Sequence, residues 1–225
     1  MTYHDYLKDK RVIFVGPAPN LLNTNKGDWI DSFDVVIRTN NWFYMIEEYP
    51  EYEYDYGTRC EVLYTNAQFA READPFPLED WKSQGLKYLN MKKVTHGGYC
   101  KTVSTRPVGT LSAPLVAQGI KSPLMGAMLV YDSLQGHPKE FWLAGMDFYL
   151  SKPEVFIPND WREYLPGYLP KKVQTWANVN NIGKKDRHDP SQNTQFFYNL
   201  WSKGDIMLSE ETLNALMLWK KNNGS

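Results

Sequence analysis

The feature that most constrains the fold is a series of short apolar runs in which polar residues do not alternate. The first is Val12 to Val15, a β-branched and aromatic run that leads into Gly16. Such a run is typical of a strand buried on both faces, as in the middle of a parallel sheet. Further strand candidates lie at residues 35–37, 62–64, 87–89, 140–143 and 205–208. The sequence therefore predicts an α/β fold with a Rossmann-like, mainly parallel sheet flanked by helices.

Start and stop signals predict helices in the second half of the chain. One helix is bounded by Pro123 and Gly136, and a second is bounded by Pro190 and Gly204. Ser209 is a good N-cap for a last helix. Proline at a first helical turn and glycine after a last turn have the backbone preferences that these positions require.

The length of 225 residues suits one α/β domain, which we assign to residues 1–225. Two segments rich in turn residues, 92–122 and 150–187, are candidates for a small lid or insertion. We interpret the first as loop and short helix. The stretch Glu47–Tyr56, which mixes acids with tyrosines, is predicted to be a solvated loop or an edge strand with its rings packed underneath.

The charge and cysteine content exclude several classes of protein. A net charge of −1 gives no broad attraction to nucleic acid or to an anionic membrane. Cys60 and Cys100 form no disulfide framework, and we find neither a signal peptide nor an apolar run long enough to cross a membrane. We therefore expect a cytoplasmic protein without a transmembrane segment.

The turn after the first strand differs from a dinucleotide-binding turn. In a G-x-G-x-x-G motif later glycines let the backbone approach a pyrophosphate, but here Ala18 and Leu21 occupy those places. Pro17 and Pro19 also lack the amide donors of a phosphate cradle. The turn offers Asn20 instead. It is either a connecting loop or a wall of a nucleotide or sugar site, and the residues leave both interpretations open.

Polar residues follow several of the predicted strands where they end. Because the carboxyl ends of parallel strands meet at one edge, these residues form a candidate site: Asn20, Asn40, Thr65, Asn66, Gly145, Asp147 and Tyr149. No pattern of metal ligands, P-loop or G-x-S-x-G motif occurs in the sequence. We expect no metal and no cofactor.

His188 is the candidate general base. It precedes the helix predicted from Pro190 and follows Lys184, Lys185 and Arg187. The positive end of a helix and three nearby cations favour the neutral imidazole that a base needs, although Asp189 opposes them in part. Neutral hydrogen-bonding groups and one base suit the transfer of a sugar to a hydroxyl.

Six blocks in order give a resemblance to a known family. They read VGPAPNL, SFDVVIRTN, YGTRCEVLYTNAQFA, PLMGAMLV, EFWLAGMDFY and RHDPSQNTQFFYNL. This series resembles the bacterial sialyltransferases of glycosyltransferase family 42, and its first, fourth and last blocks are also similar to the sialylmotifs of the animal sialyltransferases. The resemblance implies a Rossmann-like domain with a lid, metal-free inversion, and a nucleoside monophosphate leaving group, with a CMP-linked sugar as donor substrate.

The resemblance also implies roles for single residues. His188 matches the catalytic base, and Tyr149 matches a tyrosine that holds the leaving phosphate. Asn40 matches an asparagine that contacts the nucleotide, and Gly16 and Gly126 match glycines that admit it. Asn66 lies one place from the asparagine that the family has after its third strand.

Departures from the family pattern concern the donor. Pro17 replaces an asparagine beside the nucleotide, and Leu124 and Met125 replace small hydroxyl residues. A second phosphate-binding tyrosine is missing near residues 155–156. Each lost contact removes on the order of 1 kcal/mol of binding, so the donor sugar and its nucleotide stay open.

Three further questions stay open at this level. The acceptor is a glycan or another hydroxyl, with a hydroxymethylated DNA base as an alternative. A binding module for nucleotides or sugars that has lost catalysis is the alternative from outside the enzymes. The sequence also leaves open a homo-oligomer.

Overall fold

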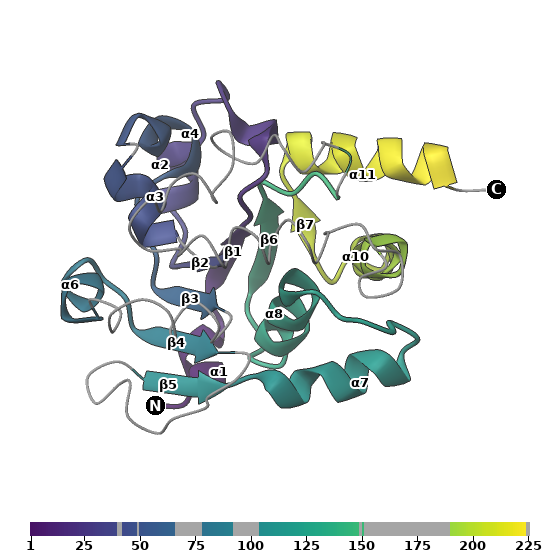
Figure 1. Ribbon diagram of the computed structural model, residues 1–225, viewed down its shortest axis with the longest axis horizontal. Coiled ribbons are helices and arrows are strands. Elements are labelled where there is room, and N and C mark those ends of the chain that lie inside the picture. Colours follow the sequence, from purple (N-terminus) through teal and green to yellow (C-terminus); the bar gives the residue numbers. More distant parts are fainter. Residues whose placement is uncertain are drawn as a thin grey trace, which may run out of the picture.

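The computed structural model describes residues 1–39, 42–48, 50–65, 78–91, 104–148, 150 and 190–223. Seven strands form one sheet in the order β5-β4-β3-β2-β1-β6-β7, and all neighbouring pairs run parallel (Figure 1). The strands are β1 (Arg11–Val15), β2 (Val35–Thr39), β3 (Val62–Thr65), β4 (Tyr88–Met91), β5 (Ser104–Pro107), β6 (Glu140–Ala144) and β7 (Met207–Leu208). The predicted α/β fold is confirmed.

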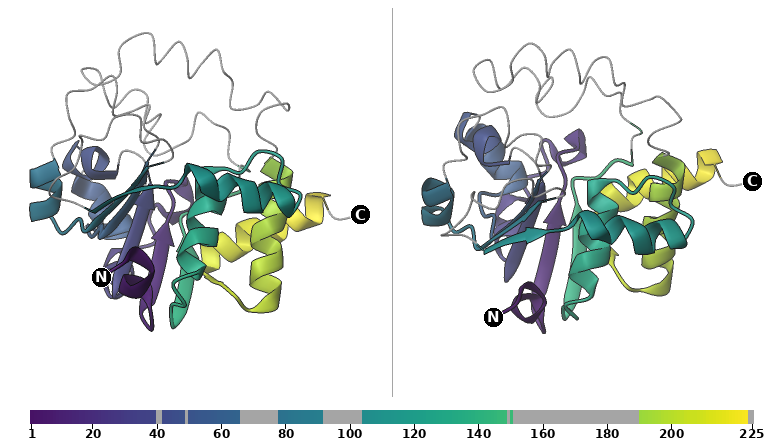
Figure 2. Two further views of the ribbon diagram at one scale, coloured as in Figure 1. Left: turned by 90° about the horizontal axis from the view of Figure 1, so that it is seen from below. Right: turned by 60° about the horizontal axis from the view of Figure 1, so that its bottom comes forward.

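Helices cover both faces of the sheet, as the two further views show (Figure 2). One face packs against α1 (Tyr3–Leu7), α7 (Ser112–Ala117), α8 (Met125–Leu134), α10 (Pro190–Lys203) and α11 (Glu210–Asn223). The other face packs against α2 (Gly27–Asp31), α3 (Trp42–Glu48), α4 (Glu53–Tyr56) and α6 (Leu78–Ser83). Single-turn 3₁₀ helices are η1 (Pro19–Leu21), η2 (Pro50–Tyr52) and η3 (Gly109–Leu111).

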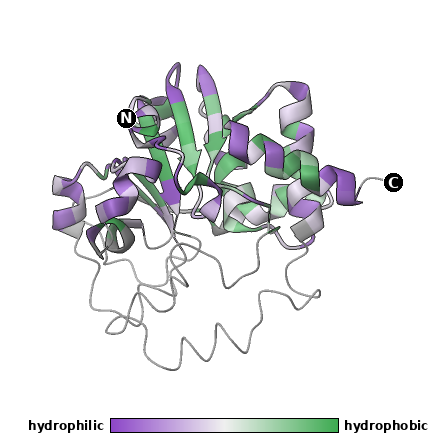
Figure 3. Cartoon of the chain, turned by 90° about the horizontal axis from the view of Figure 1, so that it is seen from above, coloured by the Kyte–Doolittle hydropathy of each residue, from purple (hydrophilic) through white to green (hydrophobic). Residues whose placement is uncertain are grey.

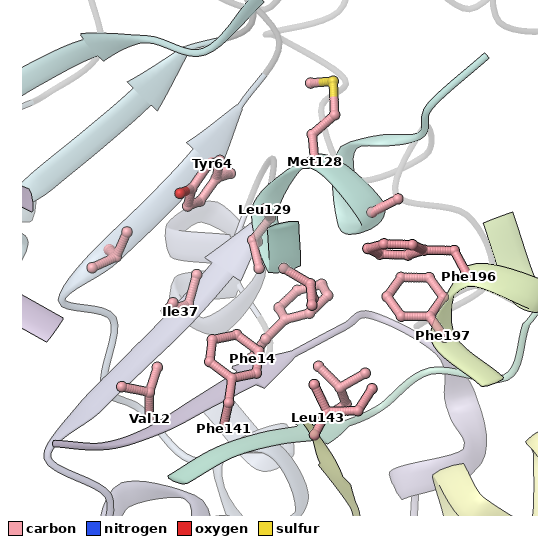
Figure 4. Close-up of a cluster of buried hydrophobic side chains, with 14 of the residues drawn as sticks. Val12, Phe14, Ile37, Tyr64, Met128, Leu129, Phe141, Leu143, Phe196 and Phe197 are labelled. Atoms are coloured by element: carbon pink, nitrogen blue, oxygen red, sulfur yellow. The ribbon is translucent and has the colours of Figure 1, made fainter. Parts of the chain in front are cut away.

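Strand β1 explains the apolar runs. Phe14 faces the core that α8 and α10 complete, where Phe197 packs nearby (Figure 4), while Ile13 and Val15 belong to the core on the opposite face. Successive side chains of a strand point to opposite faces, so a strand between two helical layers needs apolar residues at every position. Colouring by hydropathy shows the apolar strands enclosed by helices with polar outer sides (Figure 3).

The helix signals of the second half are confirmed. The helix α10 begins at Pro190 and ends at Lys203, before Gly204 with a φ of +80°. The helix α11 follows Ser209, whose Oγ accepts a hydrogen bond from the backbone amide of Thr212 at 3.4 Å. No helix in the described ranges is long and apolar enough to cross a membrane.

The structure differs from the sequence prediction in the first insertion candidate. Its described part, residues 104–122, contains the strand β5 and the helix α7 rather than loop and short helix alone. Strand β5 lies at the edge of the sheet, where a strand tolerates polar residues and the proline at its end, so it lacks an apolar run. Residues 92–103 and 151–187 lie outside the described residues, and a lid stays a prediction.

The described residues of the stretch Glu47–Tyr56 are helical rather than loop or edge strand, since they belong to the end of α3, to η2 and to α4. The expected packing of rings underneath holds for Tyr56, which is fully buried, but not for Tyr54, which is 66% exposed. Asp55 is buried as well. Neighbouring residues of a helix point only about 100° apart, so Asp55 and Tyr56 can both point inward.

Candidate functional site

The strand order reverses beside β1. Strands β2 to β5 extend the sheet on one side of β1, and β6 and β7 extend it on the other. In open α/β sheets a crevice forms outside the carboxyl ends of the strands at such a reversal, because the connections on its two sides lead to opposite faces. The fold therefore places the candidate site at the loops that follow β1 and β6.

These two loops cross at a pair of glycines. The backbone amide of Gly16 donates to the carbonyl oxygen of Ala144 at 2.9 Å, and the amide of Ala18 donates to that of Gly145 at 2.9 Å. A Cβ at Gly16 would lie 2.5 Å from the carbonyl oxygen of Gly145, and Gly145 itself has a φ of +64°. Packing of the two loops alone thus requires both glycines, and their contact with a ligand remains a prediction.

Asn20 connects the same two loops. Its Nδ2 donates to the carbonyl oxygen of Met146 at 2.9 Å, which fixes the orientation of the amide. Its Oδ1 is buried and has no hydrogen-bond partner. The buried atom of Asn20 that has no partner is therefore a hydrogen-bond acceptor, suited to a hydroxyl or amino group. Asp147, in the loop after β6, is buried too.

The N-terminus of α8 lies beside these loops. Leu124 occupies its N-cap position and its side chain caps no backbone amide, while Oδ1 of Asn193 accepts the amide of Leu124 itself at 2.9 Å. A Cβ at Gly126 would meet Phe14, Phe197 and Met146 at 3.6–3.8 Å, which is ordinary contact distance. Packing does not require glycine here. An uncapped helix start of this kind favours an anion.

Buried polar atoms without a partner gather at the same edge of the sheet. Among the described residues they belong to Asn20, Arg38, Trp42, Thr65, Asn90, Glu211 and Tyr6, and both amide atoms of Asn90 are of this kind. All except Tyr6 lie at or next to the carboxyl end of a strand. Such atoms are rare in folded proteins, and a ligand or water is a common explanation for them.

Arg38 is the cationic member of this group and is fully buried. Its Nη2 donates to the carbonyl oxygen of Tyr56 at 2.6 Å, its Nε donates to that of Arg59 at 3.0 Å, and the guanidinium lies 3.6 Å from the ring centre of Trp42. Burial lowers the pKa of Arg38 to about 10, which still leaves it charged at neutral pH.

The structure describes six of the predicted site residues. It brings together Gly16, Asn20, Gly126, Gly145 and Asp147, and it places Thr65 at the end of β3. The other four, Asn40, Asn66, Tyr149 and His188, lie outside the described residues, so their roles remain predictions. Sequence reasoning missed Arg38, Trp42 and Asn90. Position gave some signal, since each lies near the end of a predicted strand, but burial without a partner is visible only in three dimensions.

The class of protein that the fold defines is a doubly wound α/β domain with a site at its strand reversal. No protein-family model matches the chain, and no curated protein sequence matches it. Its structural neighbours are sialyltransferases from mammals and from Campylobacter.

Two of these solved structures illustrate the likeness. A mammalian sialyltransferase in complex with Gal-beta-1-3GalNAc-ortho-nitrophenol has a TM-score of 0.53 and 17% identity, over 90% of this chain and 70% of that one. The sialyltransferase CstII from Campylobacter jejuni in complex with CMP-3FNeuAc has a TM-score of 0.52 and 15% identity, over 88% of this chain and 78% of that one. The chain has the fold of these enzymes.

Proposed function

We propose that the protein is a metal-independent, inverting glycosyltransferase that moves a sugar from a CMP-linked donor to an acceptor hydroxyl. The observation that carries this proposal is that the first turn of α8 and the amide of Asn20 both lie against Met146, in the loop after β6 at the strand reversal, and that the acceptor oxygen of Asn20 has no partner. These two groups suit the phosphate and the nucleoside of one ligand. The fold shared with enzymes solved in complex with CMP and CMP-3FNeuAc supports the choice of nucleotide.

On this proposal, each end of the nucleotide has a partner. The first turn of α8, which includes Gly126, receives the phosphate at its positive end. The amide oxygen of Asn20 accepts a hydrogen bond from a ribose hydroxyl or from the amino group of the base.

The reaction then needs one proton acceptor and one group that stabilises the leaving phosphate. We propose that His188 takes the proton of the acceptor hydroxyl as its oxygen attacks the anomeric carbon. The bond from that carbon to the phosphate oxygen breaks, and CMP leaves with the electron pair while Tyr149 donates a hydrogen bond to it. Attack from the face opposite the leaving group inverts the anomeric centre.

Calorimetric titration with CMP, UDP and GDP tests the nucleotide. We expect CMP alone to bind, and at a hundredfold excess over its Kd to stabilise the fold by about 2.7 kcal/mol. Selective binding of UDP or GDP would remove the assignment to CMP and leave the fold untouched.

Turnover separates the proposal from its alternatives. Release of CMP from a panel of CMP-sugars in the presence of acceptor sugars supports an enzyme, whereas binding of the same donors without turnover supports a binding module. A steep dependence of DNA binding on salt concentration would favour a DNA base as the acceptor. The cytoplasmic location and the oligomeric state remain expectations.

A further inference from the structure

Two residues of α4, Asp55 and Tyr56, hold the loop from Gly16 to Asn25 by hydrogen bonds. The carboxylate of Asp55 accepts three consecutive backbone amides: Asn23 donates to Oδ2 at 2.7 Å, and Thr24 and Asn25 each donate to Oδ1 at 2.8 Å. Asn23 and Asn25 have φ values of 63° and 53°. The turn therefore takes a left-handed conformation that side chains rarely adopt, and Asp55 provides the hydrogen bonds that compensate for it.

Tyr56 holds the beginning of the same loop. Its hydroxyl donates to the carbonyl oxygen of Ala18 at 2.6 Å, and its ring is fully buried. Its own carbonyl oxygen accepts from Nη2 of Arg38 at 2.6 Å. Tyr56 thus connects strand β2 with the loop after β1.

Asn20 lies between these two anchors. Prolines at positions 17 and 19 have no N–H, so this part of the loop has few amides with which to hold itself in place. On one side, the loop is held by hydrogen bonds to the carbonyl oxygens of Gly145 and Met146, which follow β6. Asp55 and Tyr56 hold it from α4.

We propose that Asp55 and Tyr56 are positioning residues of the nucleotide-sugar site, which fix the loop so that the acceptor oxygen of Asn20 is in place before the ligand binds. This inference rests on the proposed function. Neither side chain touches the ligand on this account. They raise its affinity because the loop is ordered in advance, and the ligand does not have to order it.

The alternative is that both residues only stabilise the fold, and a matched control separates the two. Tyr3 is a buried tyrosine on the opposite face of the sheet, where its hydroxyl bonds Ser133 Oγ at 2.8 Å and accepts from the Tyr64 hydroxyl at 3.0 Å. Tyr3→Phe and Tyr56→Phe each remove one buried phenolic oxygen. Urea unfolding of the two variants measures the stability that each loses, and calorimetry measures the Kd of CMP.

We expect Tyr3→Phe, whose lost hydroxyl has two partners, to lose at least as much stability as Tyr56→Phe, while only Tyr56→Phe changes the affinity for CMP. Tyr56→Phe should raise the Kd of CMP about tenfold, and Tyr3→Phe should leave it within about twofold of wild type. In turnover, Tyr56→Phe should raise the KM for the donor and largely keep kcat, since a saturating ligand orders the loop itself.

Asp55→Asn tests the other anchor with a readout inside the loop. The amide has one acceptor oxygen in place of two, so exchange of the backbone amides of Asn23 and Thr24 with solvent should speed up. Saturating CMP should restore their protection, which a purely structural role does not predict.

The outcomes distinguish this inference from the proposed function. Unchanged CMP affinity in Tyr56→Phe, or an equal loss in Tyr56→Phe and Tyr3→Phe, overturns the positioning role and leaves a nucleotide-dependent glycosyltransferase intact. A wild-type chain that binds none of CMP, UDP and GDP overturns the proposed function, and the positioning role falls with it.

Discussion

The two edges of the sheet differ in how many of their polar groups have partners. At the amino edge, the exposed Asp34 accepts the backbone amide of Arg11 at 2.8 Å, and Glu61 is buried. Glu61 accepts the amide of Val36 at 2.9 Å through one oxygen and Nε of Arg59 at 2.9 Å through the other. These carboxylates all have partners within the protein.

At the carboxyl edge, Thr65 and Asn90 are fully buried and have side-chain atoms without a partner. Leaving a buried donor or acceptor unpaired costs about 1–3 kcal/mol. An edge that served only stability would largely avoid this cost, and at the amino edge the Tyr6 hydroxyl, beside Lys10 and Tyr88, is the one such atom among the described residues. This difference supports the proposal that the carboxyl edge binds a ligand, whereas the paired carboxylates of the amino edge stabilise the sheet.

The largest expected effect would come from His188→Ala, which tests the chemistry assigned to the carboxyl edge. Loss of a positioned base should lower turnover by roughly 10²- to 10⁴-fold and leave the Kd of CMP nearly unchanged, because the base acts on the acceptor. Transfer assays and calorimetry on the same preparation measure both. Transfer within about threefold of wild type would place the base elsewhere, and an equal loss of CMP binding would assign His188 to the donor phosphate.

A pair of glycine variants tests which parts of the carboxyl edge serve packing. Gly145→Ala should lower the free energy of unfolding by about 3 kcal/mol, since its φ is +64° and a Cβ would collide with the carbonyl of Gly16. Gly126→Ala is the matched control: it should unfold at the wild-type urea concentration or above. A raised Kd of CMP in this variant would place the nucleotide against Gly126, whose added methyl group packs on Phe14, Phe197 and Met146 in the structure. Equal stability losses in both variants would contradict this division.

Glu61→Gln tests the amino edge. The substitution keeps an acceptor for Val36 but loses the charge that pairs with Arg59, whose Nη2 lies 2.8 Å from Glu61 Oε1. We expect a loss of about 2 kcal/mol in urea unfolding and no change in the Kd of CMP. A change in CMP affinity larger than in stability would mean that the two edges are coupled.

The smallest effect has the opposite sign. Thr65→Val replaces a buried hydroxyl that has no partner with a methyl group of similar size, so the free energy of unfolding should rise by up to about 1 kcal/mol. CMP affinity should fall if the hydroxyl contacts the ligand. A clear loss of stability in urea would show that Thr65 Oγ1 is paired in solution, and would weaken the contrast between the edges.

The sequence by itself determined the strands that are covered on both faces and the helices that have clear start and stop residues. Strands such as β1 are apolar throughout because both faces are covered, and α10 begins and ends where Pro190 and Gly204 stand. It also predicted that polar residues collect at the carboxyl ends, since parallel strands share that edge. The sequence did not predict strand β5, because a strand at the edge of the sheet does not need an apolar residue at every position.

Only the tertiary structure decided the order of the strands, and with it the reversal beside β1 that locates the site. It also decided that Gly16 is needed for its contact with Gly145, whereas Gly126 is not needed for packing. Sequence spacing could not show that Asp55 and Tyr56 hold the loop before Asn25. The physical reason is common to all three: each depends on atoms that are distant along the chain and meet only when the sheet is complete.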